Sequence, residues 1–317
     1  MMPNQLDLQP LVLAGPTASG KSAVALLLAE QLSGEIISVD SMQVYRGLDI
    51  GTAKPSAAER QRVPHHLIDI IDLRESFDAA QFVRLAGEAI ASIQARGRLP
   101  ILCGGTGLYF KALLDGLGEA PPADARLRAE LEAISMPELL QELQQRDAAT
   151  FEKIDRQNPR RVIRALEIIR LTGKPIQRAN WAGAQNNSRR ITGFGLVRPA
   201  AELHARINTR VDVMFQIGLV NETKGLLERG LAENQTAMQA IGYRQVAEHL
   251  RDGRPLAETI ELVKIRTRQF AKRQMTWFRK YAQLEWLRCD PGESPEAVAA
   301  RLVHSWRLSR ATSDQPQ

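Results

Sequence analysis

The chain has 317 residues, of which 44% are hydrophobic and 25% charged, and its formal net charge is +6. This is the composition of a globular protein of one large domain or two, and the positive charge favours a polyanionic partner without requiring one. The two cysteines, Cys103 and Cys289, lie far apart without metal-ligand or redox spacing, so we expect no disulfide framework and a cytoplasmic location. No stretch approaches the roughly 18 apolar residues of a membrane span, so no membrane partner is expected.

The first predicted strand, residues 11–14, runs into a segment with the phosphate-loop pattern G-x-x-x-x-G-K-[ST]. The residues of this phosphate loop are Gly15, Pro16, Thr17, Ala18, Ser19, Gly20, Lys21 and Ser22. The helix that should follow has an inner face made by Val24, Leu27 and Leu28. Backbone N–H groups and the helix N-terminus then converge on a phosphate group, Lys21 adds a positive charge, and the Ser22 hydroxyl can bind Mg²⁺. The pattern does not say which phosphate compound binds or which bond breaks.

A second buried strand is predicted over residues 35–40 and ends in the carboxylate of Asp40. The segment that follows, residues 41–52, has no clean periodicity. Because the carboxyl ends of parallel strands line the ligand crevice, Asp40 should face the phosphate loop. From spacing alone Asp40 could be a catalytic group, a helix-capping residue or a ligand to a magnesium-bound water.

A further strand is predicted over residues 67–71, and a helix should begin after Asp78. The adjacent His65 and His66 would point to opposite sides of an extended chain, so we expect them to share no metal.

The next predicted strand, residues 99–103, ends in the glycine-rich segment Gly104–Tyr109, with the hydroxyl of Thr106 in its midst. Such a segment lets the backbone approach a partner closely, although a purely structural sharp reversal is the alternative. The alternation of strands and helices predicts an α/β fold with a P-loop NTPase-like parallel sheet and helices on both faces.

The pattern changes at Pro121 and Pro122 and is helical over residues 123–178. We therefore expect a helical insertion domain over residues 121–190, between the two parts of a catalytic core, 1–120 and 191–310, and a disordered tail over residues 311–317.

One helix of the insertion should begin at Asn158-Pro159 and end at Gly173. Arg160, Arg161 and Arg164 crowd its first turns. Positive charges there oppose the helix dipole, which favours an anionic partner such as a phosphate backbone, although a solvated charged face is the common alternative.

The last third of the chain returns to the core with a strand over residues 191–197 and a helix whose inner face holds Leu203, Ile207 and Val211. Residues 239–245 should form a loop that leads into a helix. The segment Lys264–Lys280 contains seven basic residues and no acid, with Phe270 and Trp277 among them. It predicts either a nucleic-acid surface or a helix with core aromatics and solvated charges.

Together, several of these segments resemble the bacterial tRNA dimethylallyltransferases, also called tRNA isopentenyltransferases. They are the phosphate loop and residues 40–45, 51–55, 104–109, 160–167, 241–245 and 268–274. Any one could be coincidence, but the set is specific because it follows the family's order over most of the chain. Phe77 and Asp78 depart from the family pattern, which has a tyrosine and a serine there, and this affects no catalytic residue. The chain also lacks the Cys/His spacing of the zinc-finger extension in eukaryotic relatives.

The resemblance implies transfer of a dimethylallyl group from its diphosphate to N6 of the adenosine just 3′ of the anticodon. It implies that the phosphate loop binds the diphosphate, that Mg²⁺ is the cofactor with Ser22 as its ligand, that Asp40 is the general base and that Thr106 orients the amine. The implied tRNA contacts are Asp40, Ser41, Met42, Gln43, Arg160, Arg161, Val162, Ile163, Arg164, Gly242, Tyr243, Arg244 and Gln245. The partners would be dimethylallyl diphosphate and the anticodon stem-loop of tRNA, and we expect a monomer.

Two other classes of protein share parts of this pattern. A small-molecule kinase of the nucleotide-kinase type would have the phosphate loop and the sheet, but would leave the basic segment Lys264–Lys280 unexplained. A nucleic-acid-binding ATPase would explain the charge but would give Asp40 and the glycine-rich segment no common task.

Overall fold

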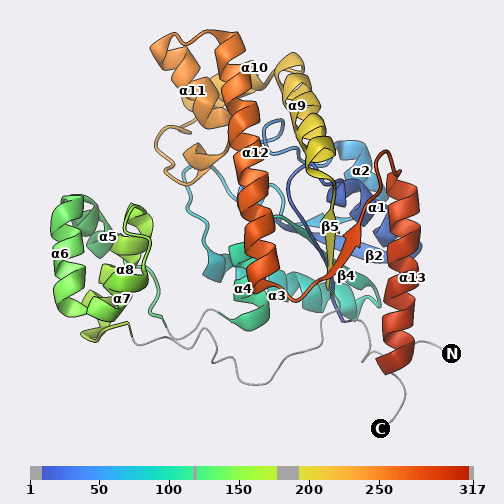
Figure 1. Ribbon diagram of the computed structural model, residues 1–317, viewed down its shortest axis with the longest axis horizontal. Coiled ribbons are helices and arrows are strands. Elements are labelled where there is room, and N and C mark those ends of the chain that lie inside the picture. Colours follow the sequence, from blue (N-terminus) through green and yellow to red (C-terminus); the bar gives the residue numbers. More distant parts are fainter. Residues whose placement is uncertain (1–8, 117–119, 177–192, 314–317) are drawn as a thin grey trace. The chain divides into compact units, whose positions relative to one another are not determined.

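The computed structural model describes residues 9–116, 120–176 and 193–313 (Figure 1). The chain divides into two compact units, one made of residues 1–113 and 189–317 and the other of residues 114–188. We call them the core unit and the helical unit. The sequence analysis expected an insertion over residues 121–190; its last part, residues 177–190, lies outside the described residues.

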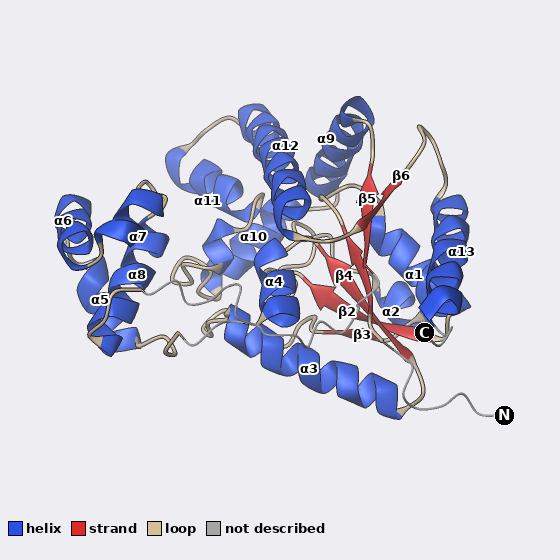
Figure 2. Ribbon diagram, turned by 60° about the horizontal axis from the view of Figure 1, so that its bottom comes forward, coloured by secondary structure: helices blue, strands red, loops and turns tan. Residues whose placement is uncertain are grey.

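The core unit is built on one sheet of six strands, all parallel to their neighbours, in the order β3-β2-β4-β1-β5-β6 (Figure 2). The strands are β1 (Leu11–Ala14), β2 (Gly34–Val39), β3 (His65–His66), β4 (Leu99–Gly104), β5 (Gly193–Val197) and β6 (Glu285–Arg288). Strand β1 is central, and its short apolar sequence is fully buried, as a parallel strand covered on both faces requires. The predicted parallel α/β sheet is confirmed.

Helices cover both faces of this sheet (Figure 2). The described helices of the core unit are α1 (Lys21–Gln31), α2 (Ala57–Arg62), α3 (Ala79–Ala95), α4 (Gly107–Asp115), α9 (Ala200–Gln216), α10 (Leu219–Glu228), the 3-10 helix η1 (Ala237–Gln239), α11 (Tyr243–Asp252), α12 (Leu256–Tyr281) and α13 (Pro295–Ser313). Alternate residues of β1 point to opposite faces. Leu11 and Leu13 pack in the cluster that contains α1 and α13, whereas Val12 and Ala14 pack in the cluster that contains α3, α4 and α12.

The helical unit contains α5 (Ala125–Glu132), α6 (Met136–Arg146), α7 (Ala148–Lys153) and α8 (Pro159–Thr172). Leu139, Leu143 and Leu166 lie in its apolar core. Helix α8 begins and ends as the sequence predicts, because Asn158 is its N-cap and Gly173, at φ 67°, is its left-handed C-cap.

Two local predictions differ from the structure. The strand expected over residues 67–71 is instead the two-residue β3 at His65–His66, because Leu67 and Asp69 take left-handed backbone conformations, φ 62° and 57°, that end the extended chain. Helix α13 runs to Ser313 and so includes residues 311–313, which were predicted to belong to the disordered tail; residues 314–317 are not described. None of the helices in the described ranges is both long enough and apolar enough to cross a membrane.

Candidate active site

Three loops leave neighbouring strands at the same edge of the sheet. The phosphate loop follows β1, Asp40 follows β2, and Thr106 lies two residues after β4. Strand β4 pairs with both β1 and β2 in parallel, with Ala14 and Val39 each opposite Gly104. The carboxyl ends of these strands therefore bring together the groups that the sequence analysis predicted for the diphosphate and for the amine.

The phosphate loop has the backbone of an anion-binding turn. Gly15 and Gly20 have φ values of 156° and 97°, and Ala18 is also left-handed, at 63°. A Cβ on Gly15 would lie 3.0 Å from the carbonyl oxygen of Leu196, so this position has little room for a side chain. Gly20 is the N-cap of α1, and the loop thus delivers free N–H groups at a helix N-terminus, where an anion is favoured.

Lys21, the first residue of α1, carries a positive charge without a carboxylate partner among the described residues. Its Nζ donates to the carbonyl oxygen of Pro16, 3.3 Å away. Burial lowers the pKa of Lys21; Cys103 and Asp40 raise it in part, and Arg210 lowers it. Asp40 is thus among the charged groups that affect the pKa of Lys21. An anion bound to the loop would compensate the positive charge of Lys21.

Arginines from the segment after β5 hold the loop from outside. The Nε atoms of Arg198 and Arg206 donate to the carbonyl oxygens of Ser19 (2.8 Å) and Ala18 (2.9 Å), and Arg210 reaches the Thr17 hydroxyl at 3.4 Å.

The charges of these arginines are not equally available. Arg198 is buried and ion-paired to Glu202 at 2.6 Å, whereas Arg206 and Arg210 have no carboxylate partner within the described ranges. Burial, with a smaller effect from Arg206, lowers the pKa of Arg210. The roles of Arg198, Arg206 and Arg210 could not be predicted from the sequence, because their contacts with the loop join residues that are roughly 180 or more positions apart.

Thr106 is hydrogen-bonded to the backbone of Val39 and Ser41, the two residues that flank Asp40. Asp40 Oδ1 accepts from the backbone N–H groups of Met42 (2.8 Å) and Gln43 (3.3 Å). The Thr106 hydroxyl accepts from Ser41 N–H at 3.2 Å, and Thr106 N–H donates to the carbonyl oxygen of Val39, also at 3.2 Å. One oxygen of Asp40 thus caps a turn and not the helix that the capping alternative expected, while Oδ2 has no hydrogen bond in the described part of the chain and is available for chemistry.

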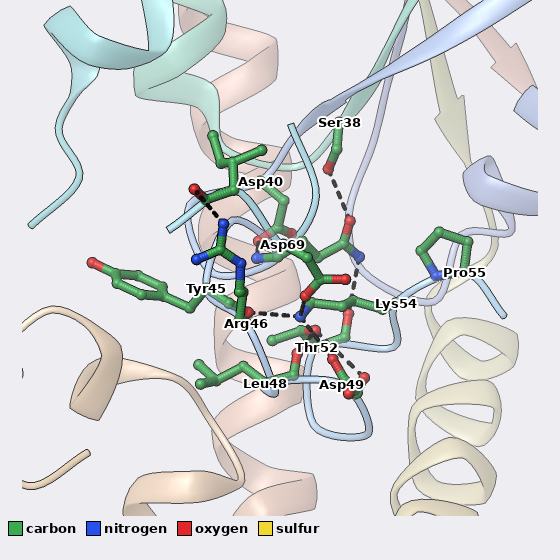
Figure 3. A network of polar contacts seen from close by, with 12 residues as sticks. Ser38, Asp40, Tyr45, Arg46, Leu48, Asp49, Thr52, Lys54, Pro55 and Asp69 are labelled. Atoms are coloured by element: carbon green, nitrogen blue, oxygen red, sulfur yellow. Dashed lines mark hydrogen bonds and ion pairs between the residues drawn. The ribbon is translucent and has the colours of Figure 1, made fainter. Parts of the chain in front are cut away.

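The segment after Asp40 is fixed from within by polar contacts (Figure 3). The amide of Gln43 accepts from the Ser38 hydroxyl at 2.8 Å and donates to the carbonyl oxygen of Thr52 at 3.1 Å. The side chain of Lys54 is only 2% exposed; its Nζ donates to the carbonyl oxygen of Tyr45 (2.6 Å) and pairs with Asp49 (2.7 Å) and with Asp69. The side-chain amide of Gln43 is therefore committed to internal hydrogen bonds, although Gln43 is partly exposed beside Asp40, as are Ser41 and Met42.

Residues 242–245 start helix α11, as the loop-to-helix prediction expected, but they are largely buried. Tyr243 is fully buried, and its hydroxyl donates to Glu222 (2.5 Å) and accepts from Gly51 N–H (3.0 Å). Gln245, 7% exposed, closes the helix start by accepting from Gly242 N–H at 2.8 Å. In this group only Arg244 is exposed.

Helix α8 divides its predicted tRNA contacts in the same way. Val162 and Ile163 are buried in the apolar core of the helical unit. Arg164 donates to Glu167 and to the carbonyl oxygen of Pro121, both at 2.6 Å.

Arg160 and Arg161 are exposed on the same helix, and Arg161 has no ion pair or hydrogen bond of its side chain within the described residues. The start of α8 thus exposes two arginines, Arg160 and Arg161.

The basic segment on α12 is mixed. Lys264 pairs with Asp212 and Arg268 donates to Asn208, so both tie α12 to α9. Trp277 contacts the rings of Phe278 and Tyr281, which matches the core alternative. The exposed charges are Arg266, Lys272, Arg273, Arg279 and Lys280, which matches the charged-surface alternative.

The described residues contain no group of three or more His, Cys, Asp or Glu side chains that could hold a metal. The adjacent histidines bond separately, His66 to Glu35 at 2.7 Å and His65 to the carbonyl oxygen of Val63 at 2.8 Å. Ser22 offers one exposed hydroxyl at the start of α1. A single protein oxygen suits Mg²⁺ held mainly by substrate phosphates and water, and does not suit a metal enclosed by protein ligands.

Comparison with known proteins gives concordant similarities. The family model described as IPP transferase matches residues 43–281, more than half of the chain. The chain is 43% identical to the tRNA dimethylallyltransferase of Pelotomaculum thermopropionicum over 92% of this chain and 95% of that protein, and 48% identical to the one of Halorhodospira halophila over 93% and 96%.

Solved structures agree with these relatives. The crystal structure of the full-length tRNA isopentenylpyrophosphate transferase from Bacillus halodurans is similar with a TM-score of 0.70 and 40% identity, over 98% of this chain and 100% of that one. A eukaryotic dimethylallyltransferase described as acting on tRNA is similar with a TM-score of 0.78 and 28% identity, over 97% and 80%.

Proposed function

The chain belongs to the IPP transferase family, and on that premise we propose that it transfers a dimethylallyl group from dimethylallyl diphosphate to N6 of the adenosine just 3′ of the anticodon in tRNA. One observation carries the proposal: Asp40 and Thr106 are joined through Ser41 at the same sheet edge as a phosphate loop with uncompensated positive charge. A phosphate site beside a free carboxylate oxygen suits a reaction in which a diphosphate leaves and an amine loses a proton.

In the proposed reaction the C–O bond of the allylic diphosphate breaks and a C–N6 bond forms. The loop N–H groups and Lys21 stabilise the negative charge that grows on the leaving diphosphate, and Arg210 adds a second positive group near Thr17. The lone pair of N6 is delocalised into the adenine ring, so the amine is a weak nucleophile. Asp40 Oδ2 accepts the N6 proton as the new bond forms, and the Thr106 hydroxyl orients the amine.

Mg²⁺ is part of the proposal, with Ser22 as its protein ligand. The ion would neutralise charge on the diphosphate when bound. Lys21 and the loop N–H groups of this chain bind the same group directly.

We further propose that tRNA contacts the exposed cations of the predicted set, Arg160, Arg161 and Arg244, and the partly exposed Ser41 and Met42. The remaining members support these contacts from within: Gln43, Tyr243 and Gln245 through the hydrogen bonds described above, Val162 and Ile163 by packing, and Gly242 and Arg164 by shaping their helices. The target adenine must leave its stack to reach Asp40, so neighbouring nucleotides need such a grip. A cytoplasmic monomer stays a prediction.

The proposal is tested by incubating the protein with labelled dimethylallyl diphosphate and total tRNA that lacks the modification, with and without Mg²⁺, followed by nucleoside analysis. We expect N6-dimethylallyladenosine to appear only when Mg²⁺ is present. The reaction should require no nucleoside triphosphate. Absence of transfer by folded protein, together with phosphorylation of a small acceptor by ATP, would overturn the proposal in favour of a kinase.

A further inference from the structure

A buried glutamine on α12 connects the loops on which the two substrates of the proposed reaction would lie. Gln274 is 7% exposed, and its side-chain amide lies between the phosphate loop and the glycine-rich segment. We infer that Gln274 is a positioning residue: its amide sets the spacing between the bound diphosphate and the amine that attacks. This inference rests on the proposed function, because that reaction requires both substrates at once.

Both ends of the Gln274 amide are used. Its Oε1 accepts from the backbone N–H of Thr17 at 2.8 Å, and its Nε2 donates to the carbonyl oxygen of Gly105 at 2.9 Å. These partners are 257 and 169 residues away in the sequence, so the bridge is tertiary and is not a by-product of local structure. A primary amide offers an acceptor and a donor from one planar group, whatever the pH.

The two glycines that flank Thr106 leave no room for a side chain between the loop and α12. A Cβ on Gly105 would lie 2.3 Å from Gln274 Nε2, and a Cβ on Gly107 would lie 2.2 Å from the ring of Trp277. One turn of α12 therefore packs on the backbone at both sides of Thr106. Since Thr106 in turn bonds the backbone at Val39 and Ser41, a shift of Gly105 would be passed to the residues that flank Asp40.

The chemistry makes this spacing consequential. In the proposed transfer the electrophilic carbon is held through its diphosphate on one loop and N6 is oriented by another, and the two loops follow different strands. A misplacement of about 1 Å between reacting groups can lower a rate about 100-fold, even when each substrate still binds. Gln274 would thus affect the rate more than the affinity for either substrate.

Three variants test the inference. Gln274→Met removes both hydrogen bonds with little change in volume, whereas Gln274→Glu retains an acceptor for Thr17 and removes the donor to Gly105. Gln269→Met, at an exposed position of the same helix, is the matched control. For each variant the melting temperature, hydrogen exchange at the Thr17 amide, the affinity for pyrophosphate and the single-turnover transfer rate at saturating substrates are measured.

We expect Gln274→Met to lower the single-turnover rate about 100-fold while its affinity for pyrophosphate changes less than about fivefold. Its Thr17 amide should exchange faster, and Gln274→Glu should keep that amide protected yet still lose rate. Gln269→Met should match the wild type in all four measurements. If Gln274→Met does not fold, the same comparison is made between Gln274→Glu and the wild type.

The failures are distinguishable. A wild-type protein that transfers no dimethylallyl group refutes the proposed function. A wild-type protein that does transfer, together with folded Gln274 variants whose rates stay within about threefold, refutes the positioning role alone. Loss of rate that follows only the fraction of folded protein would also refute it, because that is the effect of a merely structural residue.

Discussion

The arginines of the core unit and of the helical unit differ in what already surrounds them. Around the phosphate loop, Arg206 and Arg210 donate to backbone or hydroxyl oxygen and have no carboxylate partner among the described residues. On α8, Arg164 is bonded to Glu167, which is fully buried and also accepts from Arg128. Arg206 and Arg210 thus leave an anion to be supplied, whereas Arg164 and Arg128 are neutralised by the protein's own Glu167. The sequence shows the arginines but does not show which of them the fold pairs with a carboxylate.

The variant with the largest expected effect removes the positive charge of Lys21 at the phosphate loop. Lys21→Ala should lower the single-turnover transfer rate about 10³-fold, because charge on the leaving diphosphate is no longer stabilised. Lys224→Ala, on the exposed surface of α10, is the control and should leave the rate unchanged. Near-normal chemistry in Lys21→Ala would remove Lys21 from the proposed mechanism.

Asp40→Asn tests the carboxylate that the loop faces. Asparagine can still accept from Met42 N–H, so the turn should persist and tRNA should bind, while the rate falls about 10²-fold for lack of a general base. The rate is compared with that of Asp72→Asn, which changes an exposed aspartate. An unimpaired rate in Asp40→Asn would reassign Asp40 to the turn.

A change at Glu167 tests the arginines that the protein neutralises with its own carboxylate. The hydrogen bonds from Arg164 and Arg128 lower the pKa of Glu167 although burial opposes this, so its stabilisation is fully present above about pH 4.5 and is lost as the pH falls below that value. Glu167→Gln should destabilise the helical unit by roughly 2 kcal/mol at pH 7, since the arginines lose their charged acceptor.

The measurement for Glu167 is amide hydrogen exchange on α8 in the full chain between pH 7 and pH 3.5. Protection should fall on acidification in the wild type and be low throughout in Glu167→Gln, with Glu130→Gln, at an exposed position of α5, as control. Equal protection of α8 in Glu167→Gln and the wild type at pH 7 would show that the buried ion pairs contribute nothing.

The smallest expected effect separates two arginines of one helix. Arg161→Ala should reduce the slope of log affinity for tRNA against log salt by about one, the value for one lost phosphate contact. Arg164→Ala should instead lower stability with little change in slope, because its guanidinium is bonded to Glu167 and Pro121. Equal slopes for both variants would contradict the distinction drawn from burial.

A structural feature could be predicted from the sequence when the interactions that form it are local in the chain. Strand β1, the helix α1 that follows the phosphate loop and the caps of α8 depend on neighbours in sequence, and the predictions of these elements are confirmed. The prediction of a strand over residues 67–71 was wrong, because apolar content does not reveal the left-handed backbone of Leu67 and Asp69.

The candidate site shows the same limit. That Tyr243 is buried, or that Arg198 and Gln274 hold the phosphate loop, follows from contacts across much of the chain. The one available signal was the presence of Gln274 in the family segment 268–274, which marks a position without giving its task.

The distance in sequence between Thr17 and Gln274 has a consequence for the protein during its synthesis. A ribosome that has made the first half of the chain has produced the phosphate loop and Asp40, but not β5, Arg198 or α12. Strand β1 then has an open edge where β5 will pair, and the phosphate loop lacks its outer supports. The nascent chain should therefore acquire its activity in one late step, once residue 274 has emerged, and not by degrees as it lengthens.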